Sequence, residues 1–156
     1  MENKVTFDKE LIRRYDKSGP RYTSYPTAVE FSTDYTSEDY LGWVADSNDD
    51  PIPASLSLYL HIPFCDTICY YCGCSKVITK DKSKADPYIE LLKKEISLQG
   101  ALFAKDRQVS QIHWGGGTPT FLNDEQIYEI ITCIRDNFNV PADNMIESGI
   151  EVDPRT

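Results

Sequence analysis

The most informative stretch is Ser55-Leu-Ser-Leu-Tyr-Leu-His-Ile-Pro-Phe-Cys65-Asp-Thr-Ile-Cys69-Tyr-Tyr-Cys72, because it joins a strand pattern directly to a group of cysteines. Leucine and isoleucine alternate with polar residues as far as Ile62, and Pro63 then stops the alternation. One face of this strand is fully apolar, so we expect helices to pack on it. Tyr59 and His61 point the opposite way, toward the region just before the cysteine loop.

The cysteines suggest a metal centre. Three thiolates spaced as Cys65, Cys69 and Cys72 can hold an iron-sulfur cluster and leave one iron open to a small molecule. Structural zinc is the alternative, with Cys74 as a fourth ligand, although zinc usually takes two separated cysteine pairs. Disulfides are not expected, because the chain has few cysteines and begins without an apolar signal segment. Cys133 lies at the edge of a helical apolar stripe and is predicted to be a structural thiol.

Alternating strand and helix patterns follow the cysteine loop. They are a helix capped by Asp86 and running to about Phe103, a strand from Val109 to Trp114, a helix capped by Asn123 and running to Phe138, and a strand from Ile146 to Val152. This order predicts a parallel α/β unit with right-handed crossovers.

Residues with binding chemistry follow the end of each predicted strand. The cysteine loop follows the first strand, the triplet Gly115-Gly-Gly117 breaks the second, and Glu151 lies near the end of the third. Active sites of parallel sheets and barrels lie at the carboxyl ends of their strands, so we expect these features to converge. Glycines there allow the backbone to approach a ligand closely, although a simple turn is the alternative.

The chain divides into an N-terminal arm with a short helix over residues 1–54 and the first part of a barrel over residues 55–156. The arm contains Gly19-Pro-Arg-Tyr-Thr-Ser-Tyr-Pro-Thr27, whose prolines oppose a helix. Residues 37–46 are predicted to form a helix, and Asn48-Asp-Asp-Pro51 is predicted to form a turn or linker.

Composition excludes some classes of function. A net charge of −9 argues against non-specific nucleic-acid binding, and no apolar stretch is long enough to span a membrane. The charge is uneven: residues 1–25 carry +2, residues 26–50 carry −7 and the remainder carries −4.

The cysteine spacing, the aromatic Tyr71 and the preceding strand together resemble the signature of the radical S-adenosylmethionine (radical SAM) superfamily. The resemblance implies that Cys65, Cys69 and Cys72 hold a [4Fe-4S] cluster and that the amino and carboxylate groups of SAM chelate the fourth iron. The reduced cluster then cleaves SAM to a 5′-deoxyadenosyl radical.

Longer segments resemble the oxygen-independent coproporphyrinogen III oxidases (dehydrogenases). They are the arm Gly19–Thr27, His61-Ile-Pro-Phe-Cys65, Cys69-Tyr-Tyr-Cys72-Gly-Cys74, His113-Trp-Gly-Gly-Gly-Thr-Pro-Thr120 and Ile150-Glu-Val-Asp-Pro-Arg155. The resemblance implies an enzyme of anaerobic haem biosynthesis that removes two propionate carboxyl groups from coproporphyrinogen III to give protoporphyrinogen IX. It also implies a radical SAM partial (β/α) barrel, of which this chain holds about three strand-helix units after an irregular arm.

The same resemblance assigns the remaining site residues. Those expected to contact the cluster-bound SAM are Tyr59, Gly116 and Glu151, and those expected to face a second SAM are Tyr71, Gly117 and Thr118. Many members have Phe where this chain has Tyr71. Cys74 is typical of the family and is not expected to bind iron; His61 and Cys74 are the candidates for a catalytic role.

Partners also follow from the resemblance. We expect coproporphyrinogen III as substrate, an electron donor such as flavodoxin or ferredoxin, a cytoplasmic location, no nucleic acid, no membrane span, and a monomer when complete. The substrate's propionates require positive charge, and Arg13, Arg14 and Arg21 are candidates, the alternative being a solvated arm that only packs on the barrel. A complete barrel takes about 250 residues, so we expect this chain to be the N-terminal part of an enzyme.

Two other classes of protein remain open. A related haem-binding chaperone shares the cluster motif, but such relatives generally lack the arm and tend to have Asp-Phe in place of Gly73-Cys74. The second class is a small zinc-binding interaction module, which would not account for the glycine triplet or the strand pattern.

Overall fold

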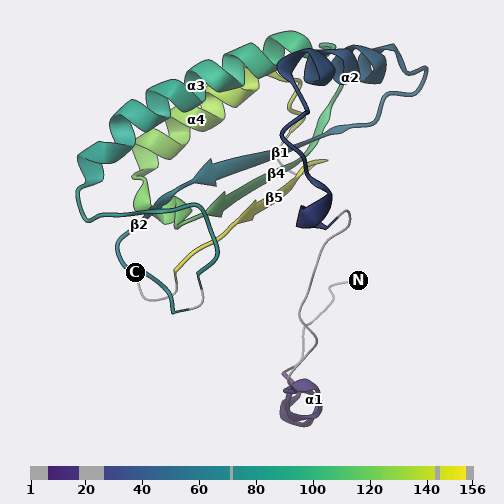
Figure 1. Ribbon diagram of the computed structural model, residues 1–156. Coiled ribbons are helices and arrows are strands. Elements are labelled where there is room, and N and C mark those ends of the chain that lie inside the picture. The colour runs from purple at the N-terminus through teal and green to yellow at the C-terminus, as the bar shows by residue number, and fades with distance from the viewer. Residues whose placement is uncertain (1–6, 18–26, 71, 143–144, 154–156) are drawn as a thin grey trace. The chain divides into compact units, whose positions relative to one another are not determined.

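The computed structural model describes residues 7–17, 27–70, 72–142 and 145–153, which form two compact units, Met1–Thr36 and Ser37–Thr156 (Figure 1). In the first unit, α1 (Lys9–Tyr15) begins at Asp8, whose carboxylate accepts hydrogen bonds from the backbone N–H groups of Glu10 and Leu11. A short 3-10 helix, η1, spans Ala28–Glu30. Tyr71 and the arm as far as Pro26 lie outside the described residues.

The second unit is built on a parallel sheet, as predicted. Its strands β1 (Leu56–Ile62), β4 (Val109–Gly116) and β5 (Glu147–Ile150) are ordered β1-β4-β5. The connecting helices α3 (Ala85–Leu102) and α4 (Asp124–Asn137) cover one face of the sheet (Figure 1). The register places Tyr59 beside His113 and Ile62 beside Gly116.

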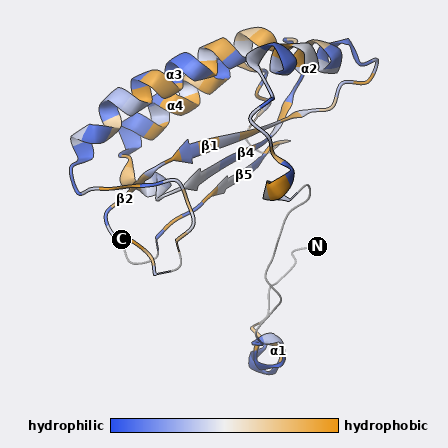
Figure 2. Cartoon of the chain, viewed as in Figure 1, coloured by the Kyte–Doolittle hydropathy of each residue, from blue (hydrophilic) through white to orange (hydrophobic). Residues whose placement is uncertain are grey.

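The core lies between this sheet and its helices. Ile62, Val109, Ile130 and Ile134 are fully buried there, whereas Tyr59 on the opposite face of β1 is 59% exposed. Both helices therefore combine polar and apolar residues along their length (Figure 2). The predicted apolar face of the first strand is confirmed. None of the helices in the described ranges combines the length and apolar character needed to cross a bilayer.

Helix α2 (Ser37–Asp49) runs past its predicted end at residue 46. Long-range hydrogen bonds explain the extension: Asn48 Nδ2 donates to the Leu102 carbonyl at 2.8 Å, and the guanidinium of Arg107 donates to Ser47 Oγ at 2.9 Å. Arg107 is buried and also donates to the carbonyl of Ala54. Asn48 and Asp49, the first two residues of the predicted turn, are therefore part of the helix.

Helix α3 begins at Ala85, directly after the 3-10 helix η2 (Lys82–Lys84), so the prediction that Asp86 caps it is wrong. Asp81 caps η2 instead, and Asp86 accepts a hydrogen bond from Gln126 Nε2 at 2.8 Å. By contrast, the predicted cap of α4 is confirmed: Asn123 and Gln126 form a reciprocal capping box.

Several strand boundaries also differ from the sequence predictions. Strand β4 continues into the glycine triplet to Gly116, and β5 is shorter than the predicted strand over 146–152. The short strands β2 (Phe64–Cys65) and β3 (Val77–Ile78) pair in parallel around the cysteine loop, and they were not predicted. A strand of two residues is too short to show an alternation of apolar and polar residues, so the sequence pattern could not predict β2 or β3.

Candidate active site

A cavity of about 570 Å³ opens at the carboxyl ends of the strands. It is bounded by the cysteine loop, by residues 116–118 at the end of β4, which we call the glycine turn, and by the residues that follow β5. Its walls include Cys65, Cys69, Cys72, Cys74, Gly116, Gly117, Thr118 and Glu151. Three segments that are distant in sequence therefore meet at one edge of the sheet, as predicted.

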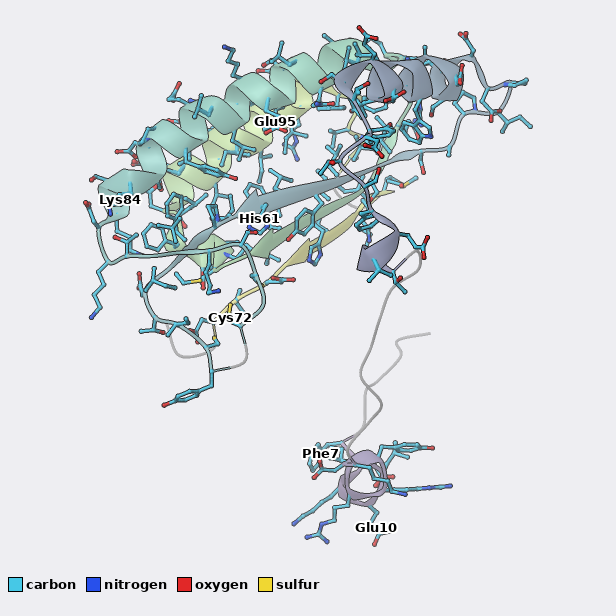
Figure 3. All side chains as sticks on the ribbon, viewed as in Figure 1. Phe7, Glu10, His61, Cys72, Lys84 and Glu95 are labelled. Atoms are coloured by element: carbon cyan, nitrogen blue, oxygen red, sulfur yellow. The ribbon has the colours of Figure 1, made fainter. Side chains whose placement is uncertain are left out.

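The cysteines of the loop differ in their surroundings. Cys65 is buried in β2, Cys69 and Cys72 are half-buried, and Cys74 is exposed. Cys69 and Cys72 are joined by a hydrogen bond in which the N–H of Cys72 donates to the Cys69 carbonyl at 3.2 Å. All are free thiols, and Figure 3 shows Cys72 in the loop beyond the end of β1.

The thiols of the loop are donors for a soft metal centre. Among the described residues, no group of three or more His, Cys, Asp and Glu side chains is arranged to hold one metal ion. Free thiols on one loop around one cavity are the donor set that iron-sulfur clusters use.

The glycine turn lies against the cysteine loop. Gly116 has φ 110°, which L side chains rarely adopt, and a Cβ there would lie 2.8 Å from the ring of His61. A Cβ on Gly117 would lie 2.7 Å from the Phe64 carbonyl oxygen. Thr118 Oγ1 reaches Cys65 Sγ at 3.6 Å. This packing requires glycine at both positions.

Glu151 is tied to the same turn from the third strand. Its Oε2 accepts a hydrogen bond from the Gly116 N–H at 3.2 Å, and its Oε1 lies 3.5 Å from His113 Nε2. The backbone N–H of Glu151 donates to the Trp114 carbonyl at 2.9 Å, continuing the sheet contact beyond the end of β5. The Glu151 carboxylate is therefore held next to the backbone of Gly116.

Tyr59 and His61 form a polar row next to the cavity. His61 Nε2 lies 2.8 Å from the Ser75 carbonyl oxygen, and because a carbonyl can only accept, this nitrogen carries the proton. In the neutral ring Nδ1 then accepts from the Tyr59 hydroxyl at 3.3 Å. The hydroxyl of Tyr88 donates to the His61 carbonyl, which fixes the end of β1.

Several acidic groups lie close together at this edge of the sheet. Burial raises the pKa of Tyr59, and the nearby charges of Glu151 and Cys74 raise it further. Burial also raises the pKa of the Cys74 thiol, and the charge of Cys72 adds to the effect. A site with thiols and a carboxylate favours a ligand that carries a cationic group.

His113 is a member of the site that the sequence predictions missed. Its ring stacks on Tyr59, with centroids 5.9 Å apart and an angle of 12° between the planes. It alternates with Gly115 on the same face of β4, and that alternation was the available signal. Of the predicted residues, Tyr71 lies outside the described residues, and Tyr59 and His61 stand beside the cavity rather than in its walls.

Comparison with known families gives one match that covers most of the second unit. The model of the radical SAM superfamily matches residues 59–156. This range contains the cysteine loop, the glycine turn and Glu151.

Curated relatives and a solved structure agree with that match. The oxygen-independent coproporphyrinogen III oxidase of Salmonella typhimurium is 51% identical over 99% of this chain, which covers 32% of that relative. The oxidase of the same name from Mannheimia haemolytica is 47% identical, with 97% of this chain and 99% of the relative covered. The structure of Escherichia coli coproporphyrinogen III oxidase, a radical SAM enzyme, matches with a TM-score of 0.74 and 47% identity over 97% of this chain and 32% of that one. The chain thus spans about a third of the length of the Salmonella relative and of the solved structure.

Proposed function

Because the chain belongs to the radical SAM superfamily and, within it, to the oxygen-independent coproporphyrinogen III oxidases, we propose that it supplies the cluster-binding and SAM-binding part of an enzyme that decarboxylates coproporphyrinogen III. One observation carries the proposal. The free thiols, the glycine turn and Glu151 border a single cavity at the carboxyl ends of the strands. Sequence identity near one half with oxidases of this name supports the choice of substrate.

Each residue then has a distinct role. Cys65, Cys69 and Cys72 would hold the [4Fe-4S] cluster, and the glycine turn would contact SAM. Gly116 gives the amino group of SAM access to the backbone, because a side chain there would collide with His61. Glu151 presents a carboxylate to the hydroxyl groups of the SAM ribose.

Tyr59 and His61 stand beside the cavity, on the side of β1. The Ser75 carbonyl holds the proton on His61 Nε2, so Nδ1 is fixed as the acceptor for the Tyr59 hydroxyl. Tyr59, held in this way by His61, is proposed to contact SAM. Cys74 places an exposed thiol in the cavity wall and, like His61, is proposed to act on the substrate side of the site.

The cofactors supply the reactive chemistry. When bound, the cluster and SAM would supply a carbon radical that takes one β-hydrogen atom from a propionate, and loss of CO₂ with transfer of one electron to an external electron acceptor would leave a vinyl group. We extend the proposal to a second SAM that faces Tyr71, Gly117 and Thr118.

Partners and location belong to the same proposal. Three arginines are candidates to bind the carboxylates of the substrate. They are Arg13 and Arg14, which lie in the last turn of α1, and Arg21. Flavodoxin or ferredoxin is the proposed electron donor. A cytoplasmic location is proposed because free thiols and a reduced cluster require a reducing compartment.

The test is turnover by the full-length protein under anaerobic conditions. With SAM, a reductant and coproporphyrinogen III, we expect protoporphyrinogen IX, CO₂ and 5′-deoxyadenosine. Cleavage of SAM without any change in the porphyrinogen would refute the substrate and leave the cofactor chemistry standing. Failure to take up iron would refute both.

A further inference from the structure

A positively charged segment follows the cysteine loop directly. Residues 76–84 carry four lysines against one aspartate, a balance of +3 in a chain whose net charge is −9. Lys80, Lys82 and Lys84 are exposed, and Lys76 is half-buried. We call residues 76–84 the lysine strip.

The centre of the lysine strip is apolar. Val77 and Ile78 form β3, yet their side chains are 42% and 44% exposed. Within the described residues, β3 pairs only with β2. Successive side chains of a strand point to opposite faces, so each face of β3 places one exposed apolar side chain beside the lysines, as on surfaces that bind another protein.

The lysine strip is attached to the proposed cluster site through its backbone. The N–H of Val77 donates to the Pro63 carbonyl at 2.7 Å, and the N–H of Thr79 donates to the carbonyl of Cys65 at 2.9 Å. One hydrogen bond therefore separates the strip from a proposed cluster ligand. A partner seated on the strip would approach the cluster closely, and electron transfer becomes faster as the distance falls.

A helix end adds to the positive potential. Helix α3 has 18 residues and begins just after Lys84, so its positively polarised end lies at the strip (Figure 3). Asp66 offsets part of the charge by pairing with Lys82 Nζ at 3.3 Å. Among the described residues, no ion pair involves Lys80 or Lys84, so their charges face solvent.

From this arrangement we propose that the lysine strip is the docking surface for an acidic one-electron carrier protein that reduces the cluster. The proposal rests on the proposed function, because reductive cleavage of SAM consumes one electron. In the transfer the carrier is oxidised by one electron and the cluster is reduced by one. A locally positive surface on an acidic protein attracts a negative partner and orients it before contact.

Single charge reversals in the cluster-loaded full-length protein test this proposal. Lys80→Glu and Lys84→Glu reverse charges in the strip, and Lys94→Glu makes the same change at an exposed position further along α3. Glu at position 84 suits a helix N-terminus, so folding should be retained. The probe is an acidic flavodoxin, supplied oxidised for binding calorimetry and fully reduced for stopped-flow measurement of cluster reduction.

We expect the strip variants to lower the flavodoxin association constant and the rate of cluster reduction by about tenfold or more, through the loss of electrostatic steering. Lys94→Glu should leave both unchanged, and dithionite should reduce the cluster of every variant at the parent's rate. The parent's binding should weaken as salt is added, and that of the strip variants should weaken less.

Two outcomes would overturn the proposal. One is reduction of the strip variants by flavodoxin at the parent's rate. The other is unchanged flavodoxin binding together with altered sedimentation of the variants alone, which would make the strip a contact between copies of this chain. Absence of a reducible cluster in the parent would instead count against the proposed function, so the two failures are distinguishable.

Discussion

At the scale of single residues, Cys74 differs from the other cysteines of its loop although it lies only two positions after Cys72. Its side chain is exposed, whereas Cys65 is buried and Cys69 is half-buried. This difference in exposure separates Cys74 from the three thiols that are predicted to hold the cluster. The three-ligand assignment stays a prediction.

Iron analysis of two variants tests that assignment. After anaerobic reconstitution of the full-length protein, Cys69→Ala should lose the cluster absorption and most of its iron, because two thiolates are too few to hold it. Cys74→Ala should keep the iron content of the parent. Equal losses in the two variants would contradict the three-ligand assignment, and zinc uptake without iron would support a zinc centre.

Gly116 provides a second test at this scale, because its backbone has a positive φ and its neighbour leaves no room for a side chain. Gly116→Ala would bring a methyl group within 2.8 Å of His61, and the strained conformation costs on the order of 1–3 kcal/mol. We expect weaker SAM binding by calorimetry and a lower melting temperature, with the iron content unchanged.

Gly73 is the matched control for this substitution. It lines the same cavity, and a Cβ at this position would meet nothing within 4 Å. Gly73→Ala should therefore bind SAM nearly as the parent does. If Gly116→Ala binds SAM as tightly as Gly73→Ala, the glycine turn has only a structural role.

At the scale of helices and strands, the sequence predicts best what neighbouring residues determine. The cap of α4 is local, since Asn123 and Gln126 satisfy one another, and it was predicted correctly. The end of α2 depends on Leu102 and Arg107, which lie more than fifty residues away, and it was missed. The start of α3 was misplaced because Asp86 bonds to Gln126 of α4 instead of capping its own helix.

Two helical glycines give opposite predictions for one substitution. Gly42 lies in α2, where an added methyl group would meet nothing within 4 Å, so Gly42→Ala should stabilise the protein by about 0.5–1 kcal/mol through helix propensity. Gly100 of α3 packs against α4, and a Cβ there would lie 2.8 Å from Asn137 Cβ. Overpacking typically costs about 1–3 kcal/mol.

Gly100→Ala should therefore lower the free energy of unfolding while Gly42→Ala raises it, as measured by urea denaturation of the full-length protein. The pair also serves as its own control, because the chemical change is identical. Stabilisation of similar size in both variants would show that α3 and α4 can separate slightly at no cost.

At the scale of the whole molecule, the site was predicted from motifs and its internal contacts were not. The cysteine spacing and the glycine triplet are continuous in sequence, and the carboxyl-end rule brings them together. The stacking of His113 on Tyr59 depends on the register between β1 and β4, and the Ser75 contact of His61 depends on the path of the loop. Neither the register between β1 and β4 nor the path of the loop can be predicted from a local sequence pattern.

In the part of the chain that the structure describes, the outer strands β1 and β5 of the three-stranded sheet each pair only with β4. Within the described residues, β5 is hydrogen-bonded along only one edge, to β4, and Ile150 and Val152 are 46% and 58% exposed. An open edge beside apolar side chains promotes pairing between molecules. We therefore expect the isolated chain to self-associate in sedimentation experiments and to show no decarboxylation of coproporphyrinogen III.

A chimera tests the same prediction in the opposite direction. It joins residues 1–156 to the remaining two thirds of the Salmonella typhimurium oxidase, whose matching region is 51% identical. The added segments should cover the β5 edge and complete the walls of the cavity, so the chimera should sediment as a monomer and release 5′-deoxyadenosine together with protoporphyrinogen IX. Robust decarboxylation by residues 1–156 alone would contradict this view, because the open edge and the partly walled cavity would then suffice for catalysis.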